Sequence, residues 1–154
     1  MTECVWTIGY EKSGWSEFLT KLISVGIMLV IDVRDLPLSR RAGFSKRQLA
    51  AGLREAGIGY VHLRALGTPP EGREANHRRE WGRFWRIVDA RLETLEAEIA
   101  LQELATRTPS CLLCYEADPG ICHRKRVSEI LAARYGFTIQ HLLIRDESVV
   151  NPAC

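Results

Sequence analysis

The chain has 154 residues, 46% of them hydrophobic, which suits one globular domain with a well-formed core. Its formal net charge of +2 excludes the strong overall field that draws a protein to nucleic acid or to a membrane surface. No stretch approaches the ~18 apolar residues of a membrane span, and the first residues do not form a secretion signal, so the odd count of five cysteines favours reduced thiols. We therefore expect a cytoplasmic protein without a membrane partner.

The first half of the chain alternates between short apolar runs and segments with helical periodicity. Residues 5–8 predict a strand, and Ser13 is placed to cap a helix that follows it. Residues 27–31 are continuously apolar, as expected of a strand that a parallel sheet buries on both faces. Ser45 begins a capping-box pattern that predicts a second helix, and residues 59–63 predict a third strand.

The second half continues the alternation after the longest connection in the chain. We expect a loop at 68–72, followed by helical spacing from Trp81 to Ile99 in one long helix or two shorter ones. The remaining segments are a strand at 111–115, a helix that ends at Gly136, a strand at 137–144 and a peripheral tail at 146–154.

Strands that alternate with helices predict right-handed crossovers and a mostly parallel sheet covered by helices on both faces. We therefore expect residues 1–145 to form a single three-layer α/β/α domain with five strands. The connection between the third and fourth strands, about 47 residues, suits a crossover that returns past the first strand. This predicts the strand order 3-2-1-4-5, with a ligand crevice where the turn at Tyr10 meets the turn at 116–124.

Residues 111–126 concentrate more reactive side chains than any other segment. An apolar strand ends in two acids, and a thiol, an imidazole and three cations then open a helix. Glu116 stands one residue past the strand and has no capping role, so it is the favoured general acid or base. Asp118 precedes a proline and is either a ligand-binding carboxylate or a helix N-cap. We expect Arg124 to bind an anion beside the positive end of the helix dipole.

Cys122 and His123 are the candidates to assist catalysis. A thiol in the first turn of a helix, beside cationic groups, has a lowered pKa and more thiolate. The alternative is that Cys122 is a small buried helix residue. Together with Cys111 and Cys114 these residues make four potential zinc ligands, but residues three apart on a strand point to opposite faces, so we expect no metal. The sequence specifies no cofactor.

The polar loop after the second strand is rich in arginines. Arg34, Arg40 and Arg41 are able to clamp a phosphate or carboxylate in the bidentate way that lysine does less well. Asp32, at the end of the same strand, joins the candidate ligand-binding residues. Two alternatives remain: a solvated basic loop, or a structural pairing of Arg34 with Asp32 or Asp35.

Several blocks along the chain resemble the bacterial and archaeal domain of unknown function 488 family. The blocks are Thr7-Ile-Gly9-Tyr, Asp32-Val-Arg34 with Pro37-Leu-Ser39-Arg40, Gly43-Phe-Ser45-Lys46, Tyr60-Val-His62-Leu with Leu66-Gly67, and Leu112-Leu-Cys114 to Cys122-His123-Arg124. The resemblance covers nearly the whole chain and implies a compact α/β domain in which these blocks form one shared site. It implies no particular activity.

The leading hypothesis is an enzyme, a hydrolase or transferase, acting on a small phosphorylated or nucleotide-like ligand in the crevice. The alternative is an accessory protein that binds nucleic-acid phosphates through two basic clusters, 40–47 and 124–126. Trp81, Phe84 and Trp85 alternate with arginines as in a base-stacking surface, but their helical spacing favours a core role. The sequence does not predict an oligomeric partner.

Overall fold

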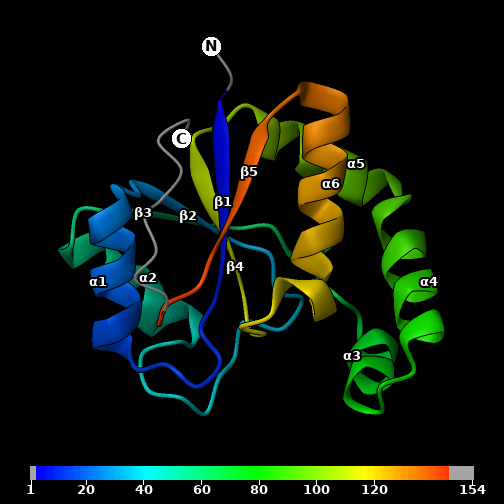
Figure 1. The fold of residues 1–154 in the computed structure, drawn as a ribbon, viewed down its shortest axis with the longest axis horizontal. Helices are drawn as coiled ribbons and strands as arrows, with labels where there is room; N and C mark the ends of the chain where they lie inside the picture. The colour runs from blue at the N-terminus through cyan, green and yellow to red at the C-terminus, as the bar shows by residue number, and fades with distance from the viewer. Residues whose placement is uncertain (1–2, 146–154) are drawn as a thin grey trace.

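Five parallel strands run through the middle of the molecule in the computed structural model, which describes residues 3–145 (Figure 1). The sheet has the order β3-β2-β4-β1-β5, and every pair of neighbours is parallel. The strands are β1 (Cys4–Gly9), β2 (Leu29–Asp32), β3 (Gly59–His62), β4 (Ser110–Cys114) and β5 (Thr138–Leu142). The predicted single-domain α/β fold is confirmed.

The expected strand order 3-2-1-4-5 is wrong, because β1 and β4 are exchanged. β4 pairs with β1, as predicted, but it is inserted on the side of β2 and so separates β1 from β2. The length of the crossover did not specify the side of β1 on which the returning strand is inserted. β4 is buried along its whole length and takes the centre, whereas β5 carries the polar Gln140 and His141 and takes an edge.

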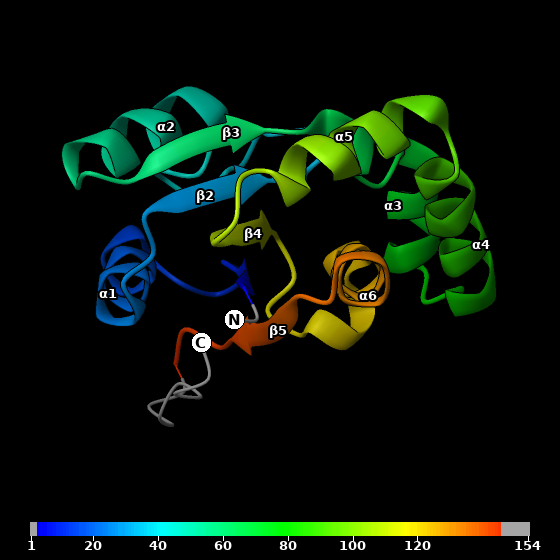
Figure 2. The ribbon, with the colours of Figure 1, turned by 90° about the horizontal axis from the view of Figure 1, so that it is seen from above.

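Helices cover both faces of the sheet and complete three layers (Figure 2). α1 (Trp15–Val25) and α2 (Lys46–Glu55) lie on one face, and α5 (Leu95–Ala105) and α6 (His123–Tyr135) lie on the other. α4 (Trp81–Leu92) packs against α5 and α6, and α3 (Pro70–His77) packs against α4. Because side chains alternate along β4, Cys111 belongs to the core under α1 and α2, while Leu112 and Cys114 belong to the opposite core.

One local feature differs from the sequence-based expectation, and another decides between two alternatives that the sequence left open. The expected loop at 68–72 contains the start of α3, where Pro70 is tolerated because the first helical residue needs no amide donor. The helical region that begins at Trp81 is two helices, and Thr94 separates them by accepting a hydrogen bond from the Ala97 amide at 3.2 Å.

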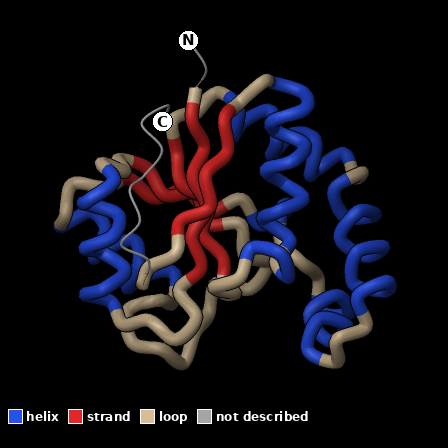
Figure 3. The backbone as a smooth tube through the Cα atoms, viewed as in Figure 1, coloured by secondary structure: helices blue, strands red, loops and turns tan. Residues whose placement is uncertain are grey.

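The loops at the carboxyl ends of the strands gather at one edge of the sheet, the lower edge in Figure 3. The turns after β1 and β4 approach so closely at Gly9 that a Cβ there would lie 1.7 Å from the carbonyl oxygen of Glu116. The Tyr10 hydroxyl accepts a hydrogen bond from Arg34 Nη1 at 3.0 Å, which joins the β1 turn to the β2 loop. The predicted convergence of these loops is confirmed, and the predicted tail at 146–154 lies outside the described residues.

Candidate functional site

A pocket of about 1240 Å³ opens at this edge of the sheet. Its floor is formed where β1, β2 and β4 end, at Tyr10, Arg34, Cys114, Glu116 and His123. Residues 35–41 form one wall, and α3 together with the start of α4 forms the wall opposite. The position matches the rule that open parallel sheets bind ligands at the carboxyl ends of their strands, where successive connections leave for opposite faces.

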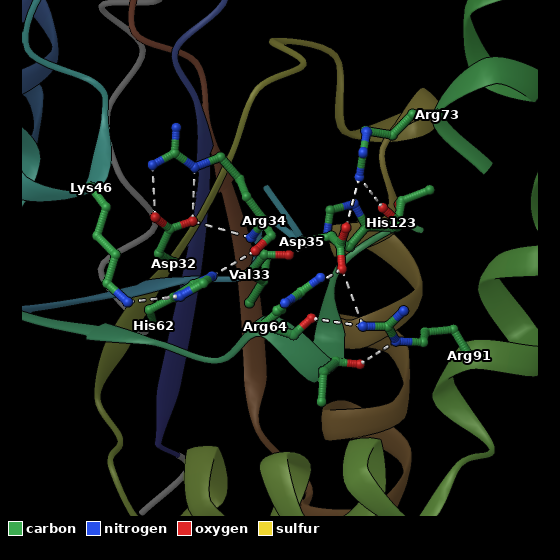
Figure 4. Close-up of polar contacts among 12 residues, drawn as sticks. Asp32, Val33, Arg34, Asp35, Lys46, His62, Arg64, Arg73, Arg91 and His123 are labelled. Carbon is green, nitrogen blue, oxygen red and sulfur yellow. Dashed lines mark hydrogen bonds and ion pairs between the residues drawn. The ribbon is translucent and has the colours of Figure 1, made fainter. Parts of the chain in front are cut away.

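Asp32 and Arg34 form an ion pair at the floor of the pocket (Figure 4). Arg34 donates to both carboxylate oxygens of Asp32, at 2.9 Å from Nε and 2.7 Å from Nη2, and both side chains are buried. Tyr60 donates its hydroxyl to the same carboxylate at 2.6 Å. The remaining guanidinium nitrogen, Nη1, donates to the Tyr10 hydroxyl and to the Phe44 carbonyl. The structure therefore shows the structural pairing that was the alternative to anion binding at Arg34.

Burial by itself lowers the pKa of the Arg34 guanidinium, but the hydrogen bonds and charge of Asp32 outweigh burial and raise that pKa. Arg34 therefore stays charged, and its charge is compensated within the protein. The same carboxylate, together with burial, raises the pKa of Tyr60, so its hydroxyl remains a donor.

Asp35 links the pocket wall formed by α3 and α4 to the loop that follows β2. Its buried carboxylate accepts from Arg64 at 3.3 Å, Arg73 at 2.9 Å and Arg91 at 3.2 Å, which come from the short 3₁₀ helix η1 (Arg64–Leu66), from α3 and from α4 (Figure 4). Burial raises the pKa of the Asp35 carboxyl, but the hydrogen bonds from Arg73 and Arg64 outweigh it and hold the pKa below its usual value.

A thiol–imidazole cluster lies at the back of the floor. Cys114 ends β4, Cys122 is the N-cap of α6, and His123 is the first residue of that helix. His123 Nδ1 lies 3.6 Å from Cys114 Sγ and 3.8 Å from Cys122 Sγ, and both cysteines are free and buried. His123 Nε2 lies 2.7 Å from the Val33 carbonyl oxygen (Figure 4). Because a carbonyl only accepts, Nε2 carries the proton, and Nδ1 faces the two sulfur atoms.

Glu116 completes this cluster on the pocket side. Cys114 Sγ lies 3.5 Å from Glu116 Oε2. Burial and the charge of Cys122 raise the pKa of Glu116 to about 7. Burial raises the pKa of the Cys122 thiol, but its hydrogen bond with Cys114 and the charges of His123 and Arg124 lower it further than burial raises it. The group therefore combines a carboxyl, two cysteine sulfur atoms and an imidazole, each within a few ångströms of another member.

Arg124 holds the turn that carries Glu116. Its fully buried guanidinium donates from Nε to the Thr7 hydroxyl at 3.1 Å, from Nη2 to the Ala117 carbonyl at 3.2 Å, and from Nη1 to the Glu116 carbonyl. Three hydrogen bonds to neutral oxygen atoms leave it no face toward the pocket. Arg124 therefore holds the backbone of the 116–117 turn in position and does not line the pocket.

The predicted site residues divide into two groups. Six line the pocket: Tyr10, Arg34, Arg40, Arg41, Glu116 and His123. Four lie behind or outside its lining: Asp32, Asp118, Cys122 and Arg124. Asp118 is the N-cap of the short 3₁₀ helix η2 (Pro119–Ile121) and accepts from the Gly120 amide at 2.8 Å, which is the structural alternative considered for it.

Sequence reasoning missed several residues that line the pocket. Arg79 lies in the α3–α4 connection, Trp81 begins α4, and Tyr115 lies in the turn after β4. Trp81 is 37% exposed, whereas Phe84 on the same helix is buried in the core as predicted. The alternation of arginine with aromatic residues was the available signal, but helical spacing did not reveal which aromatic residue stays outside the core.

The basic residues near the pocket and those on α6 differ in whether their side chains are already bonded within the protein. The guanidinium groups of Arg40, Arg41 and Arg79 make no hydrogen bond or ion pair with residues 3–145, and all three side chains are exposed. In contrast, Arg126 pairs with Asp89 at 3.0 Å and Lys125 pairs with Glu129 at 2.7 Å. The basic groups of the pocket wall therefore include unpaired ones, whereas Lys125 and Arg126 of α6 are paired.

Comparison with known proteins identifies one family. The family model described as "Domain of unknown function DUF488" matches residues 14–131. Neither the curated proteins nor the solved structures include a significant match to the chain. None of the helices within residues 3–145 is both long and apolar enough to cross a membrane.

Proposed function

The chain belongs to the DUF488 family, and from the residues that line its pocket we propose that it is an enzyme, a hydrolase or transferase, acting on a small phosphate-bearing or nucleotide-like ligand. The observation that carries this proposal is the distribution of charge around the pocket. Three guanidinium groups without a partner among residues 3–145 line the pocket, and two nearby carboxylates, those of Asp32 and Asp35, are already bonded to other arginines.

Arg40, Arg41 and Arg79 are the proposed anion-binding residues. Arg40 and Arg41 lie on the wall formed by the β2 loop, and Arg79 lies on the opposite wall, so a phosphate between them meets cations from two sides. Arginine suits this role because its planar fork matches two phosphate oxygens at once. Trp81 and Tyr115 offer aromatic surface in the same pocket, which suits a base or a sugar face.

Glu116 and His123 are the proposed reactive groups that line the pocket. They lie on the floor, where a ligand held by the arginines of the walls would present its reacting bond. We assign proton transfer to Glu116, with His123 and Cys122 as supporting groups. We also place the protein in the reducing cytoplasm, where Cys111, Cys114 and Cys122 remain thiols.

Ligand binding tests this proposal directly. Adenosine monophosphate, ribose 5-phosphate and pyrophosphate are titrated calorimetrically, with adenosine as the uncharged control. We expect at least one phosphorylated probe to bind, and the Arg40→Ala/Arg41→Ala variant to bind it at least about tenfold more weakly, because each charge-assisted hydrogen bond contributes about 1.5–3 kcal/mol. The matched control is Arg47→Ala, an exposed arginine of α2 that does not line the pocket.

Equal affinity in the double variant and in the control would refute the assignment of the arginines. The alternative function, nucleic-acid binding, predicts tighter binding of oligonucleotides than of mononucleotides and a steep dependence on salt. It has less support, because the second of its two basic clusters is occupied by ion pairs with Asp89 and Glu129 and by the buried Arg124.

A further inference from the structure

We propose that Cys114, Cys122 and His123 bind one zinc-type divalent metal ion at the floor of the pocket. The potential ligand atoms are the two Sγ atoms and His123 Nδ1, and all three lie within 4.8 Å of one another. They come from two elements, the end of β4 and the start of α6, which the sheet and the core hold in fixed positions.

The distances fit a tetrahedral ion. Zinc binds sulfur at about 2.3 Å and nitrogen at about 2.0–2.1 Å, so tetrahedral angles place a sulfur and a nitrogen ligand about 3.6 Å apart. The Nδ1 atom of His123 lies 3.6 Å from Cys114 Sγ and 3.8 Å from Cys122 Sγ. Both nitrogen–sulfur distances therefore match a shared ion, while the two sulfur atoms lie within 4.8 Å of each other, against about 3.8 Å in a tetrahedral zinc site.

The imidazole is already held in the orientation that a metal requires. His123 Nε2 donates its proton to the Val33 carbonyl at 2.7 Å, so Nδ1 is the nitrogen that faces the two sulfur atoms and that a metal ion would bind in place of a proton. Histidine ligands of zinc usually make this kind of second hydrogen bond, since it fixes both the tautomer and the ring orientation. Val33 follows β2 directly, so the sheet itself sets the angle of the ring.

Charge also favours an ion at this position. Two thiolates and a neutral imidazole bring a charge of −2, and a divalent ion compensates it fully in an environment where all three side chains are buried. The Cys114 and Cys122 sulfur atoms contact His123 Nδ1, and Cys114 also contacts Glu116.

The fourth coordination position faces the pocket. Cys114 and His123 line the pocket, whereas Cys122 closes the site from behind. Glu116, whose Oε2 lies 3.5 Å from Cys114 Sγ, stands beside the open position. Three protein ligands with one open position are typical of zinc sites that activate water or polarise a substrate oxygen. This last step rests on the proposed function, whereas binding of the ion does not.

The alternation of side chains along β4 excludes only Cys111 from the site. Cys111 lies in the core under α1 and α2, on the opposite face of the strand from Cys114. The two cysteines are both buried and belong to the same strand, so Cys111→Ala is a matched control for Cys114→Ala.

Cobalt titration of the reduced, chelator-treated full chain tests the inference. We expect one equivalent of Co²⁺ to produce the sulfur-to-cobalt charge-transfer band and the strong visible bands of a tetrahedral thiolate site, and Zn²⁺ to abolish both. Cys114→Ala and Cys122→Ala should each bind Co²⁺ at least about tenfold more weakly. Loss of a residue that only hydrogen-bonds a metal ligand already lowers metal affinity by about 10–100-fold, and these variants lose a ligand itself. Cys111→Ala should bind as the unmodified chain does.

Absence of the charge-transfer band in the unmodified chain would overturn the inference, and this result does not depend on whether any variant folds. Equal Co²⁺ affinity in the Cys114→Ala and Cys111→Ala variants would overturn it as well. Phosphate-ligand binding is measured separately on the metal-free and zinc-loaded chain. A chain that binds zinc but no phosphorylated probe contradicts the proposed function alone, and the reverse result contradicts the metal site alone.

Discussion

The buried pair of Asp32 and Arg34 provides the sharpest test of how the floor of the pocket is held. The substitution Asp32→Asn preserves the shape of the side chain and removes its charge. Asp32 is fully buried, and its carboxylate accepts four hydrogen bonds, three from Arg34 and one from Tyr60. The substitution therefore leaves the Arg34 guanidinium buried without a compensating charge.

Removing one partner of a buried ion pair costs about 3–5 kcal/mol, because the remaining charge has lost both its partner and its access to water. A domain of this size has a free energy of unfolding of about 5–15 kcal/mol. We therefore expect Asp32→Asn to remove a large share of the total stability. Tyr60→Phe removes only one hydrogen bond to the carboxylate and should cost less, about 1.5–3 kcal/mol.

Urea unfolding followed by tryptophan fluorescence measures both effects, since the chain contains four tryptophans. The slope of the unfolding free energy against urea should stay unchanged, which would show that the native state keeps its compactness. Asp32→Asn combined with Arg34→Met should recover part of the loss, because no unpaired charge then remains in the core. A loss for Asp32→Asn no larger than that for Tyr60→Phe would refute this account of the pair.

Two further predictions concern the edge of the sheet. Gly9→Ala should lower the melting temperature, because the new Cβ would lie 1.7 Å from the Glu116 carbonyl oxygen and the turn must move; overpacking of this kind costs about 1–3 kcal/mol or more, and an unchanged melting temperature would contradict it. Asp35→Asn should lower stability at neutral pH, because the pKa of the Asp35 carboxyl, although raised by burial, is held low overall by Arg73 and Arg64. A depressed pKa stabilises the fold above the unfolded value of about 3.9 and loses that effect as the pH falls through the folded pKa, so the stability difference between the two chains should shrink below about pH 4. A difference that stays constant from neutral pH to pH 3 would show that the charge of Asp35 is not involved.

Much of the fold could be predicted because it depends on local patterns. Uninterrupted apolar runs located β2 and β4, and their alternation with helical periodicity indicated the parallel sheet. The place of β4 could not be predicted from such patterns, since it depends on where a long crossover rejoins the sheet. α3 was missed because Pro70 is equally typical of a loop and of a first helical turn.

A pocket lies at the sheet edge where the sequence predicts a crevice, but the sequence did not show which candidate residues line it. Sequence places Arg34, Arg40 and Arg124 near one edge of the sheet, yet it does not show which guanidinium groups are already bonded within the protein. Arg124 donates hydrogen bonds to Thr7 and to two backbone carbonyls. These bonds depend on how the 116–123 turn folds. The same turn brings Cys122 back to Cys114, a proximity that strand alternation alone did not reveal.

The central position of β4 also determines the order in which the sheet is able to assemble. β2 and β3 are neighbours and have a partner in each other as soon as both have left the ribosome. β1 is different: its two partners are β4 and β5, so the first strand to be synthesised waits for one that begins only at Ser110. Until then β1 and β2 both carry unpaired strand edges, which are templates for aggregation. The topology thus makes assembly dependent on sequence-distant contacts, which slow folding, and it leaves the nascent N-terminal half unable to complete a sheet by itself.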